Sequence, residues 1–298
     1  MKHDVIIIGG SYAGMSAALP LARARRAVLV VDEGLRRNRF AAASHGFLTQ
    51  DGVAPDEIAA TARTQLMAYG TVQWAQARAV QLSGQADDFS VTLQDGTQHH
   101  ARRVILASGV SDALPTLPGL AERWGRQVFH CPYCHGYELQ QGAIGVLATS
   151  EMSSHQALML PDWGPTTFFL HKQPMPAADT LAQLQARGVS LVQGPVAHLR
   201  GDANVLQVIM ADGRHFDLAG LFIASRIQPG PLATQLGCAL DDSPMGSYVR
   251  TDAVKSTTVP GVFACGDLAR AAGSVPLAVG DGAMAGVGAH RSLMFGLD

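Results

Sequence analysis

The sequence predicts an α/β protein with two domains, and three observations support this fold class. Its 298 residues are about twice the length of a typical domain. Strand-like and helix-like segments alternate over residues 1–115, and the same alternation returns over residues 143–192. A glycine-rich turn separates the first strand from the first helix. This order of elements is typical of three-layer domains built on a parallel sheet.

The first strand and its turn have the pattern of a Rossmann-like, dinucleotide-binding unit. A strand-like segment at residues 4–8 leads into GGSYAG at residues 9–14, and a helix of small residues follows. Glycines let this turn tighten, so that the helix N-terminus can face a pyrophosphate. Ser11 replaces the middle glycine of the usual motif and limits how closely the backbone approaches the phosphate. The expected contacts of the dinucleotide are Gly9, Ser11, Tyr12, Ala13 and Gly14.

Carboxylates and arginines follow the second strand, which is expected at residues 27–31. Asp32 and Glu33 end this strand, where a carboxylate is expected to accept hydrogen bonds from the adenosine ribose. Three arginines follow in the next loop. Such charged runs are usually solvated, but the position of Arg39 favours contact with the adenosine and the phosphates.

The remaining elements are predicted from periodicity and from turn residues. The first segment should contain a helix at residues 55–69 and strands at residues 71–82, 89–94 and 102–107. Pro115, Pro118 and Gly119 mark a linker. The second segment should contain strands at residues 143–148, 166–170 and 189–192, with helices at residues 152–160 and 178–187. A last helix is expected from residue 274, with Pro276 in its first turn.

Two cysteines, Cys131 and Cys134, form a C-x-x-C run that lies between His130 and His135. The pair can close a small disulfide ring if a helix begins near Cys134. Amide groups at a helix start also favour thiolate, the reactive form, over thiol. A zinc half-site is the alternative. No second C-x-x-C or H-x3-5-H pair follows in the sequence, so no metal is expected.

A third motif lies near the C-terminus and, together with the other two, points to one protein family. Residues 258–267, TVPGVFACGD, have the pattern of a turn, a short buried strand and an acidic residue, Asp267. The three ordered motifs resemble the low-molecular-weight thioredoxin reductase family of FAD-dependent disulfide oxidoreductases over essentially the whole chain. The resemblance implies two Rossmann-like, three-layer domains, the second inserted into the first. Residues 1–115 and 244–298 would bind FAD, and residues 116–243 would carry the cysteine pair.

The resemblance also implies FAD contacts outside the first βαβ unit. Asp267 in the Gly-Asp pair would bind the ribityl chain, and the last helix would point its N-terminus at the flavin, where a positive dipole end stabilises reduced flavin. The glycines of that helix could instead serve only helix or dimer packing. His45 and Gln50 fall where chains of this family pass the isoalloxazine ring. The other implied contacts are Ala107, Gly109, Gly266 and Val275.

The segment CPYCHGYE at residues 131–138 indicates the direction of the reaction. It resembles the dithiol oxidases of gliotoxin and holomycin biosynthesis more than the reductases, which usually carry aspartate after the second cysteine. His135 takes that position here. Imidazole, with an unperturbed pKa near 6.5, can accept a proton from a substrate thiol. His130 is the competing base, and a partly buried His135 bonded to the backbone is the alternative role.

The resemblance implies that Cys131 exchanges with a small-molecule or protein dithiol, while Cys134 lies against the flavin. Electrons would pass from the substrate through the cysteine pair to FAD and then to dioxygen, which yields hydrogen peroxide. A thioredoxin reductase that uses NADPH or another donor is the alternative enzyme. A flavin-containing redox sensor without catalysis is the alternative from another class.

NADPH binding is in doubt because the second βαβ repeat lacks a phosphate-binding turn. Residues 148–154, ATSEMSS, offer no glycine, and the charge of Glu151 would repel a pyrophosphate. Lys172 stands where the reductases carry an arginine pair for the 2′-phosphate. One lysine is a poor substitute for a bidentate pair of arginines.

Charge and composition exclude other classes of partner. A net charge of −2 and an isoelectric point near 6.6 provide no basic stripe for nucleic acid or an anionic membrane. No apolar run approaches the ~18 residues of a membrane span, and residues 1–8 do not lead us to expect a secretory signal. We expect a cytoplasmic protein and, by resemblance, a homodimer. Cys238 and Cys265 have no nearby base and are expected to be small packing residues.

Overall fold

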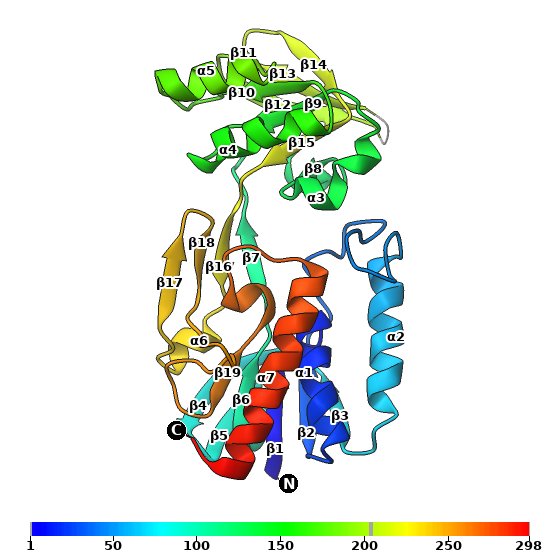
Figure 1. Cartoon of the computed structure of the whole chain (residues 1–298), viewed down its shortest axis with the longest axis vertical. Coiled ribbons are helices and arrows are strands. Elements are labelled where there is room, and N and C mark those ends of the chain that lie inside the picture. Colours follow the sequence, from blue (N-terminus) through cyan, green and yellow to red (C-terminus); the bar gives the residue numbers. More distant parts are fainter. Residues whose placement is uncertain (1, 203–204, 298) are drawn as a thin grey trace. The chain divides into compact units, whose positions relative to one another are not determined.

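The computed structural model describes residues 2–202 and 205–297, which fold into two compact units (Figure 1). Unit 1 consists of Met1–Arg39, Phe47–Ser111 and Ile227–Asp298, and unit 2 consists of Phe40–Gly46 and Asp112–Arg226. Each unit is an α/β body with a central sheet, and unit 2 interrupts the sequence of unit 1. The predicted class, two Rossmann-like domains with the second inserted into the first, is confirmed.

The boundaries between the units differ from the expected ones in three places. Unit 2 begins at Asp112, before the expected residue 116, and the return to unit 1 comes at Ile227, before the expected residue 244. The reason is packing, because Leu232 and Cys238 are buried in the unit 1 core with Leu82 and Phe89. Residues 40–46 also group with unit 2, although the chain on either side of them belongs to unit 1.

The sheet of unit 1 has seven strands, in the order β3-β2-β1-β6-β5-β4, with β19 paired to β6. The pairs β1·β2, β1·β6, β2·β3 and β6·β19 are parallel, whereas β4 and β5 form an antiparallel extension. Apolar strands β1 and β2 are buried on both faces, as expected for the centre of a parallel sheet. The bounds are β1 Lys2–Ile8, β2 Val28–Asp32, β3 Val72–Gln76, β4 Ala79–Gln85, β5 Asp88–Leu93, β6 Gln98–Leu106 and β19 Val262–Ala264.

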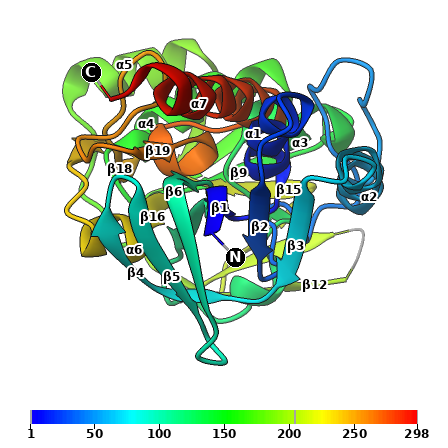
Figure 2. The ribbon, with the colours of Figure 1, turned by 90° about the horizontal axis from the view of Figure 1, so that it is seen from below.

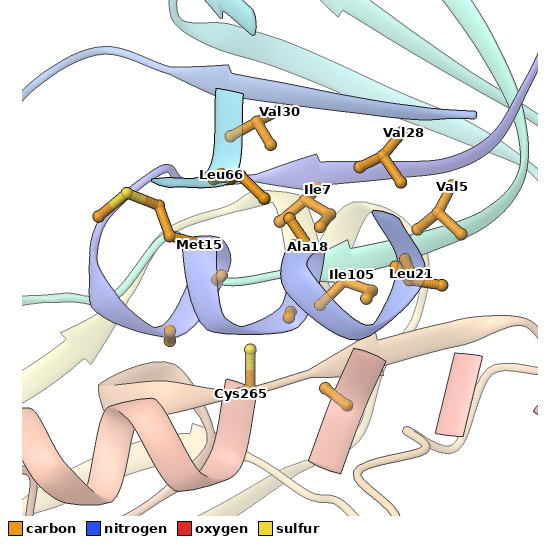
Figure 3. Packing of buried hydrophobic residues seen from close by; sticks show 14 of the residues in the cluster. Val5, Ile7, Met15, Ala18, Leu21, Val28, Val30, Leu66, Ile105 and Cys265 are labelled. Atoms are coloured by element: carbon orange, nitrogen blue, oxygen red, sulfur yellow. The ribbon is translucent and has the colours of Figure 1, made fainter. Parts of the chain in front are cut away.

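Helices α1 (Tyr12–Arg23), α2 (Pro55–Met67) and α7 (Val275–Phe295) pack on one face of this sheet (Figure 2). Glycines on α7 let it approach α1 closely, since a Cβ on Gly282 of α7 would collide with the carbonyl of Ala13 on α1. Figure 3 shows this layer, in which Ala18 and Leu21 of α1 lie against the sheet residues. The other face packs against the short helix α6 (Leu232–Gln235) and η4 (Gly266–Ala269).

Unit 2 is built on a parallel five-stranded sheet, in the order β11-β10-β9-β15-β8. Helices α4 (Met152–Met159) and α5 (Ala178–Ala186) share one core with this sheet, and a three-stranded antiparallel sheet shares another. The second sheet was not predicted. Its strands are β12 Val196–Gly201, β13 Leu206–Met210 and β14 His215–Leu218; the parallel strands are β8 Val128–Phe129, β9 Ile144–Leu147, β10 Thr166–Phe169, β11 Ser190–Val192 and β15 Gly220–Ile223.

A third, four-stranded sheet has the order β17-β18-β16-β7, with β7 at Val110–Ala113, β16 at Arg226–Pro229, β17 at Leu240–Ser243 and β18 at Gly246–Val249. Short helical turns complete the chain: η1 Ala121–Arg123, α3 Pro132–His135, η2 Tyr137–Leu139 and η3 Leu160–Asp162. Across residues 2–202 and 205–297, no helix has both the length and the apolar character that a membrane span requires.

Candidate active site

Cys131 and Cys134 are joined by a disulfide, and their Cα atoms are 5.4 Å apart. Helix α3 begins at Pro132, so Cys131 is its N-cap residue and Cys134 lies within its single turn. The amide of Cys134 donates to the carbonyl of Cys131 over 3.3 Å. Both cysteines are half-buried. The sequence pattern therefore forms a small ring that presents both sulfurs on one helical turn of unit 2.

Exposed aromatic side chains flank this ring. The exposed fractions are 73% for Tyr133 and 81% for Tyr137, which are high for tyrosine. Tyr133 meets Trp163 edge to face, with ring centroids 5.3 Å apart. Trp163 also packs against the backbone of Gly136, where a Cβ would come within 2.7 Å of the indole. Sequence reasoning did not assign these aromatics, although two tyrosines inside the CPYCHGYE segment were a visible signal.

His135 has a different environment from the one expected of a base. Its ring stacks on Phe129 of β8, with centroids 4.4 Å apart and an interplanar angle of 24°. Burial and, less strongly, the charge of His45 lower the pKa of His135 to about 4. The expected titration near pH 6.5 is therefore wrong, and His135 is neutral at physiological pH.

The depressed pKa of His135 predicts a loss of stability in acid. The unfolded chain binds a proton as pH falls through about 6.5, whereas the folded chain does so only near 4, so stability is lost between these values. We expect about 2 kcal/mol to be lost between pH 7 and pH 5 through this group. Urea unfolding of His135→Gln at both pH values should lack that loss.

The exposed His215 provides the matched control for this measurement. His215→Gln should retain the full pH dependence of the wild-type protein. If His135→Gln loses as much stability between pH 7 and pH 5 as the wild type does, the buried, neutral state assigned to His135 is wrong.

His130 lies on the other side of the cysteine pair and is half-buried. Its ring is 5.9 Å from that of Trp124, and its backbone carbonyl accepts a hydrogen bond of 2.9 Å from the amide of Gln156. Gln156 is itself buried on α4. The contact fixes the backbone just before Cys131 to the helix layer of unit 2.

The glycine-rich turn of unit 1 fits the pyrophosphate of a bound dinucleotide. Gly9 has a φ of +105°, and a Cβ there would collide with the carbonyl of Ala107. A Cβ on Gly14 would collide with the carbonyl of Gly9. The turn is therefore lined by backbone, as a phosphate cradle requires. The amide of Gly10 donates to Oδ1 of Asp32 over 3.0 Å, which holds the acidic end of β2 at the turn.

Other residues predicted to contact the dinucleotide contribute to the turn in different ways. Ser11 is the N-cap residue of α1 and makes no side-chain capping bond. The phenol of Tyr12 donates to the carbonyl of Pro55 over 3.2 Å, so this side chain fixes the start of α2. Ala13 packs at Gly266, where a Cβ would come within 2.8 Å of it. Glu33 is exposed and lies 3.8 Å from Arg78.

Asp267 pairs with an arginine that sequence reasoning did not single out. Nη1 of Arg37 is 2.8 Å from Oδ2 of Asp267, and both side chains are about one-fifth exposed. Arg39, the arginine that the sequence favoured, is exposed and donates to the carbonyl of Arg36 over 2.8 Å. The arginines at residues 36–39 predicted a basic contact, but only the fold shows that Arg37 is the one that reaches the carboxylate of Asp267.

The remaining predicted contacts occupy both units. Gly109 and Gly266 adopt φ values of +68° and +69°, which glycine tolerates. Val275 is the first residue of α7. Gln50 lies in a turn, where its backbone amide donates to the carbonyl of Phe47. His45 belongs to unit 2, where its Nε2 lies 3.4 Å from Oε1 of Glu138. Ala107, the last of these predicted contacts, donates its amide to the carbonyl of Ile8 over 2.8 Å.

The two cysteines outside the disulfide lie in the protein core. Cys238 and Cys265 are buried, and burial raises the pKa of Cys265 to about 12. Both are packing residues, as expected. In the parts of the chain that the structure describes, no three His, Cys, Asp or Glu side chains group as metal ligands would.

Comparison with known proteins agrees with this architecture. The family described as pyridine nucleotide-disulphide oxidoreductase matches residues 3–282. Thioredoxin reductase sirT of Leptosphaeria maculans is 32% identical over 96% of this chain and 93% of its own length. An oxidoreductase from Agrobacterium tumefaciens is 56% identical, with a TM-score of 0.95 over 99% of both chains. HlmI is 35% identical, with a TM-score of 0.91 over 98% of this chain and 93% of its own.

The match runs through both units and includes all three sequence motifs. The FAD cradle of unit 1 and the disulfide of unit 2 are the two parts that such an enzyme requires. The chain therefore belongs to the pyridine nucleotide-disulphide oxidoreductase family, among its thioredoxin reductase-like, FAD-dependent enzymes.

Proposed function

We propose that the protein is an FAD-dependent dithiol oxidase, which forms a disulfide in a substrate dithiol and delivers the electrons to dioxygen. The observation that carries this direction is the turn between β9 and α4. The amides of Thr149 and Ser150 both donate to Oγ of Ser153, over 2.9 and 3.2 Å. Ser153 is completely buried. The chain's own hydroxyl therefore takes the amides that a nucleotide's pyrophosphate would need.

Three neighbouring positions support the same conclusion. The hydroxyl of Thr149 donates to the carbonyl of Ala224 over 3.2 Å, and Ser225 donates to Asp112 over 2.9 Å. Nδ1 of His171 accepts from the amide of Val196 over 2.9 Å. The first bond connects the segments that follow β9 and β15, and the other two connect the segments that follow β15 and β10 to β7 and β12. An enzyme without a pyridine nucleotide site needs another source of electrons, and in this proposal that source is the thiol substrate.

The cysteine pair performs the exchange with substrate in this proposal. A substrate thiolate attacks Sγ of Cys131, the bond to Cys134 breaks, and Cys134 leaves as a thiolate. The second substrate thiolate then attacks the substrate sulfur of the mixed disulfide, and Cys131 leaves. The substrate has lost two electrons and two protons, and the enzyme holds a dithiol. FAD, when bound to the turn at Gly9–Gly14 and to Asp267, supplies the acceptor for that electron pair and its route to dioxygen.

The resemblance of CPYCHGYE to dithiol oxidases supports this direction, and the thioredoxin reductase names of the relatives favour the rival. A reductase would run electrons from NADPH or another donor to a disulfide. A redox sensor without catalysis would show no substrate-dependent turnover. The identity of the electron donor thus distinguishes the oxidase from the reductase, and substrate-dependent turnover distinguishes both enzymes from the sensor.

Oxygen consumption tests the proposal. Purified protein should be yellow and should release FAD on denaturation. Added 1,4-dithiothreitol in air should produce one hydrogen peroxide for each disulfide formed, over many turnovers. Protein that binds FAD but consumes no oxygen with dithiothreitol, while reducing a disulfide at the expense of another donor, would overturn the oxidase in favour of the reductase.

We also propose a cytoplasmic homodimer. A pair that cycles between dithiol and disulfide suits a reducing compartment. Five apolar side chains lie along one side of α7, away from the buried face that packs on α1, and a second copy would cover them. The mass of the protein in solution tests this, and a monomer would contradict it. The exposed side chains are Leu277, Met284, Val287, Met294 and Phe295.

A further inference from the structure

A buried ion cluster in unit 1 joins α7 to the part of the chain that carries Asp267. Asp281 lies on α7 and is only 8% exposed. Nζ of Lys255 is 2.9 Å from its Oδ1, and Nε of Arg270 is 3.7 Å from its Oδ2. The side chain of Lys255 is itself only 16% exposed. Asp281, Lys255 and Arg270 form what we call the Asp281 cluster.

The two cations of the cluster lie on either side of Asp267 in the sequence. Arg270 follows η4 directly, three residues after Asp267. Lys255 precedes β19, and its carbonyl accepts a hydrogen bond of 3.0 Å from the amide of Ala264, the last residue of that strand. Asp281 therefore attaches the chain before Asp267 and the chain after it to one position on α7.

The carboxylate of Asp267 is in close contact with the segment that follows Arg270. A Cβ on Gly273 would collide with Oδ1 of Asp267, so the backbone of residues 270–274 packs directly on this carboxylate. Arg37 meets the other oxygen, Oδ2, over 2.8 Å. The position of the segment 270–274 thus helps to fix where the Asp267 carboxylate lies.

The same segment leads into the start of α7. Ser274 is the N-cap residue of this helix, and its Oγ accepts from the amide of Leu277 over 3.5 Å. Asp281 follows within about two helical turns. Asp267 and the start of α7 are the two parts of this region that are expected to contact the flavin. The Asp281 cluster connects the stretches of chain that carry them.

We propose that the Asp281 cluster is a positioning device for FAD. It holds residues 270–274 in place, and so sets the Asp267 carboxylate and the start of α7 for the ribityl chain and the flavin. A buried ion pair gives little net stability compared with packed apolar residues, so stability alone does not account for a charged cluster here. This inference rests on the FAD site of the proposed function, but not on the direction of electron flow.

The test is the dissociation constant of FAD, measured from the fluorescence of the flavin that is released when the holoprotein is serially diluted. Arg270→Gln leaves Asp281 paired with Lys255 and should raise this constant about tenfold. Arg270→Lys keeps the charge and should recover most of the affinity. Arg291→Gln, the same change at an exposed arginine of α7, should bind FAD as the wild type does.

A double-mutant cycle shows whether Arg270 acts through Asp281. Asp281→Asn should weaken FAD binding at least as much as Arg270→Gln does, and adding Arg270→Gln to it should change the constant less than about twofold. A tenfold loss from Arg270→Gln in both backgrounds would overturn the cluster. If Asp281→Asn fails to fold, Lys255→Met with Asp281→Leu supplies the background, because this pair leaves no buried charge without a partner.

Two further results distinguish this inference from its alternatives. A cluster with only a structural role would lower the free energy of unfolding in urea and leave the dissociation constant of FAD unchanged, which would refute the proposal. Failure of the FAD site itself would appear in Asp267→Asn, which would then bind FAD as tightly as the wild type. Failure of the oxidase would leave all these constants as expected, while the wild-type protein would not oxidise 1,4-dithiothreitol.

Discussion

Replacement of either Cys131 or Cys134 by serine is expected to abolish dithiol oxidation, with a loss of more than about 10³-fold in turnover. The physical reason is that one thiol cannot both form the mixed disulfide and resolve it. The structure joins the two sulfurs on a single helical turn, so no other cysteine can replace either partner: Cys238 and Cys265 are both buried. Hydrogen peroxide formation with dithiothreitol measures the loss.

The two serine variants should differ in one respect. Cys134 is proposed to lie against the flavin, so Cys134→Ser should change the visible spectrum of the bound FAD more than Cys131→Ser does. Cys238→Ser is the matched control, because Cys238 is buried beside Thr257 with an Sγ–Oγ1 distance of 3.6 Å, in the core of unit 1. The control should oxidise dithiothreitol normally. Full turnover in either Cys131→Ser or Cys134→Ser contradicts the assignment of the pair.

The fold and the main parts of the site could be predicted because their signals are local. The turn at residues 9–14 carries its glycines within six positions, and strands β1 and β2 each contain a run of four apolar residues. Asp32 ends β2 and meets Gly10 because a βαβ unit brings these positions together. The C-x-x-C spacing is likewise local, and the helical turn from Pro132 to His135 closes it.

The chemistry of the histidines could not be predicted because it depends on distant residues. His135 is neutral because burial disfavours its charged form, with a smaller contribution from the charge of His45, 90 positions earlier in the sequence. Phe129, on which the ring stacks, is only six residues away, but the sequence does not show that the two rings are buried together. The same holds for Arg37, which reaches Asp267 across 230 positions of sequence. Burial and charge at a site are properties of the assembled fold, whereas a motif carries only its residue types.

The turn at Thr149–Ser153 could be predicted from the sequence only in part. Its sequence lacks glycine, and this predicted a poor phosphate site. Only the structure shows that Oγ of Ser153 accepts hydrogen bonds from two amides of the turn. From the sequence alone, this serine could equally have pointed to solvent. A pyrophosphate would therefore compete with Ser153 for these amides, in addition to being crowded by side chains. It would have to displace an internal hydrogen-bond acceptor that is completely buried.

NADPH is accordingly expected neither to bleach the flavin nor to stabilise the protein. A ligand present at 100 times its dissociation constant would add about 2.7 kcal/mol to the free energy of unfolding. We expect no shift in melting temperature at millimolar NADPH, whereas a pyridine nucleotide enzyme of this family would show one. In the anaerobic cuvette, NADPH should reduce the flavin at least about 10³-fold more slowly than dithiothreitol does.

The melting and bleaching measurements separate binding from electron transfer. NADPH that stabilises the protein without bleaching the flavin would show a working nucleotide site and refute the account of the Thr149–Ser153 turn. Rapid, stoichiometric bleaching would make the reductase the leading function, and the acceptor would then be a disulfide. Absence of both effects, with fast bleaching by dithiothreitol, leaves the thiol substrate as the source of electrons. The direction of flow then follows from Ser153, because the turn that would admit a hydride donor is filled by the chain itself.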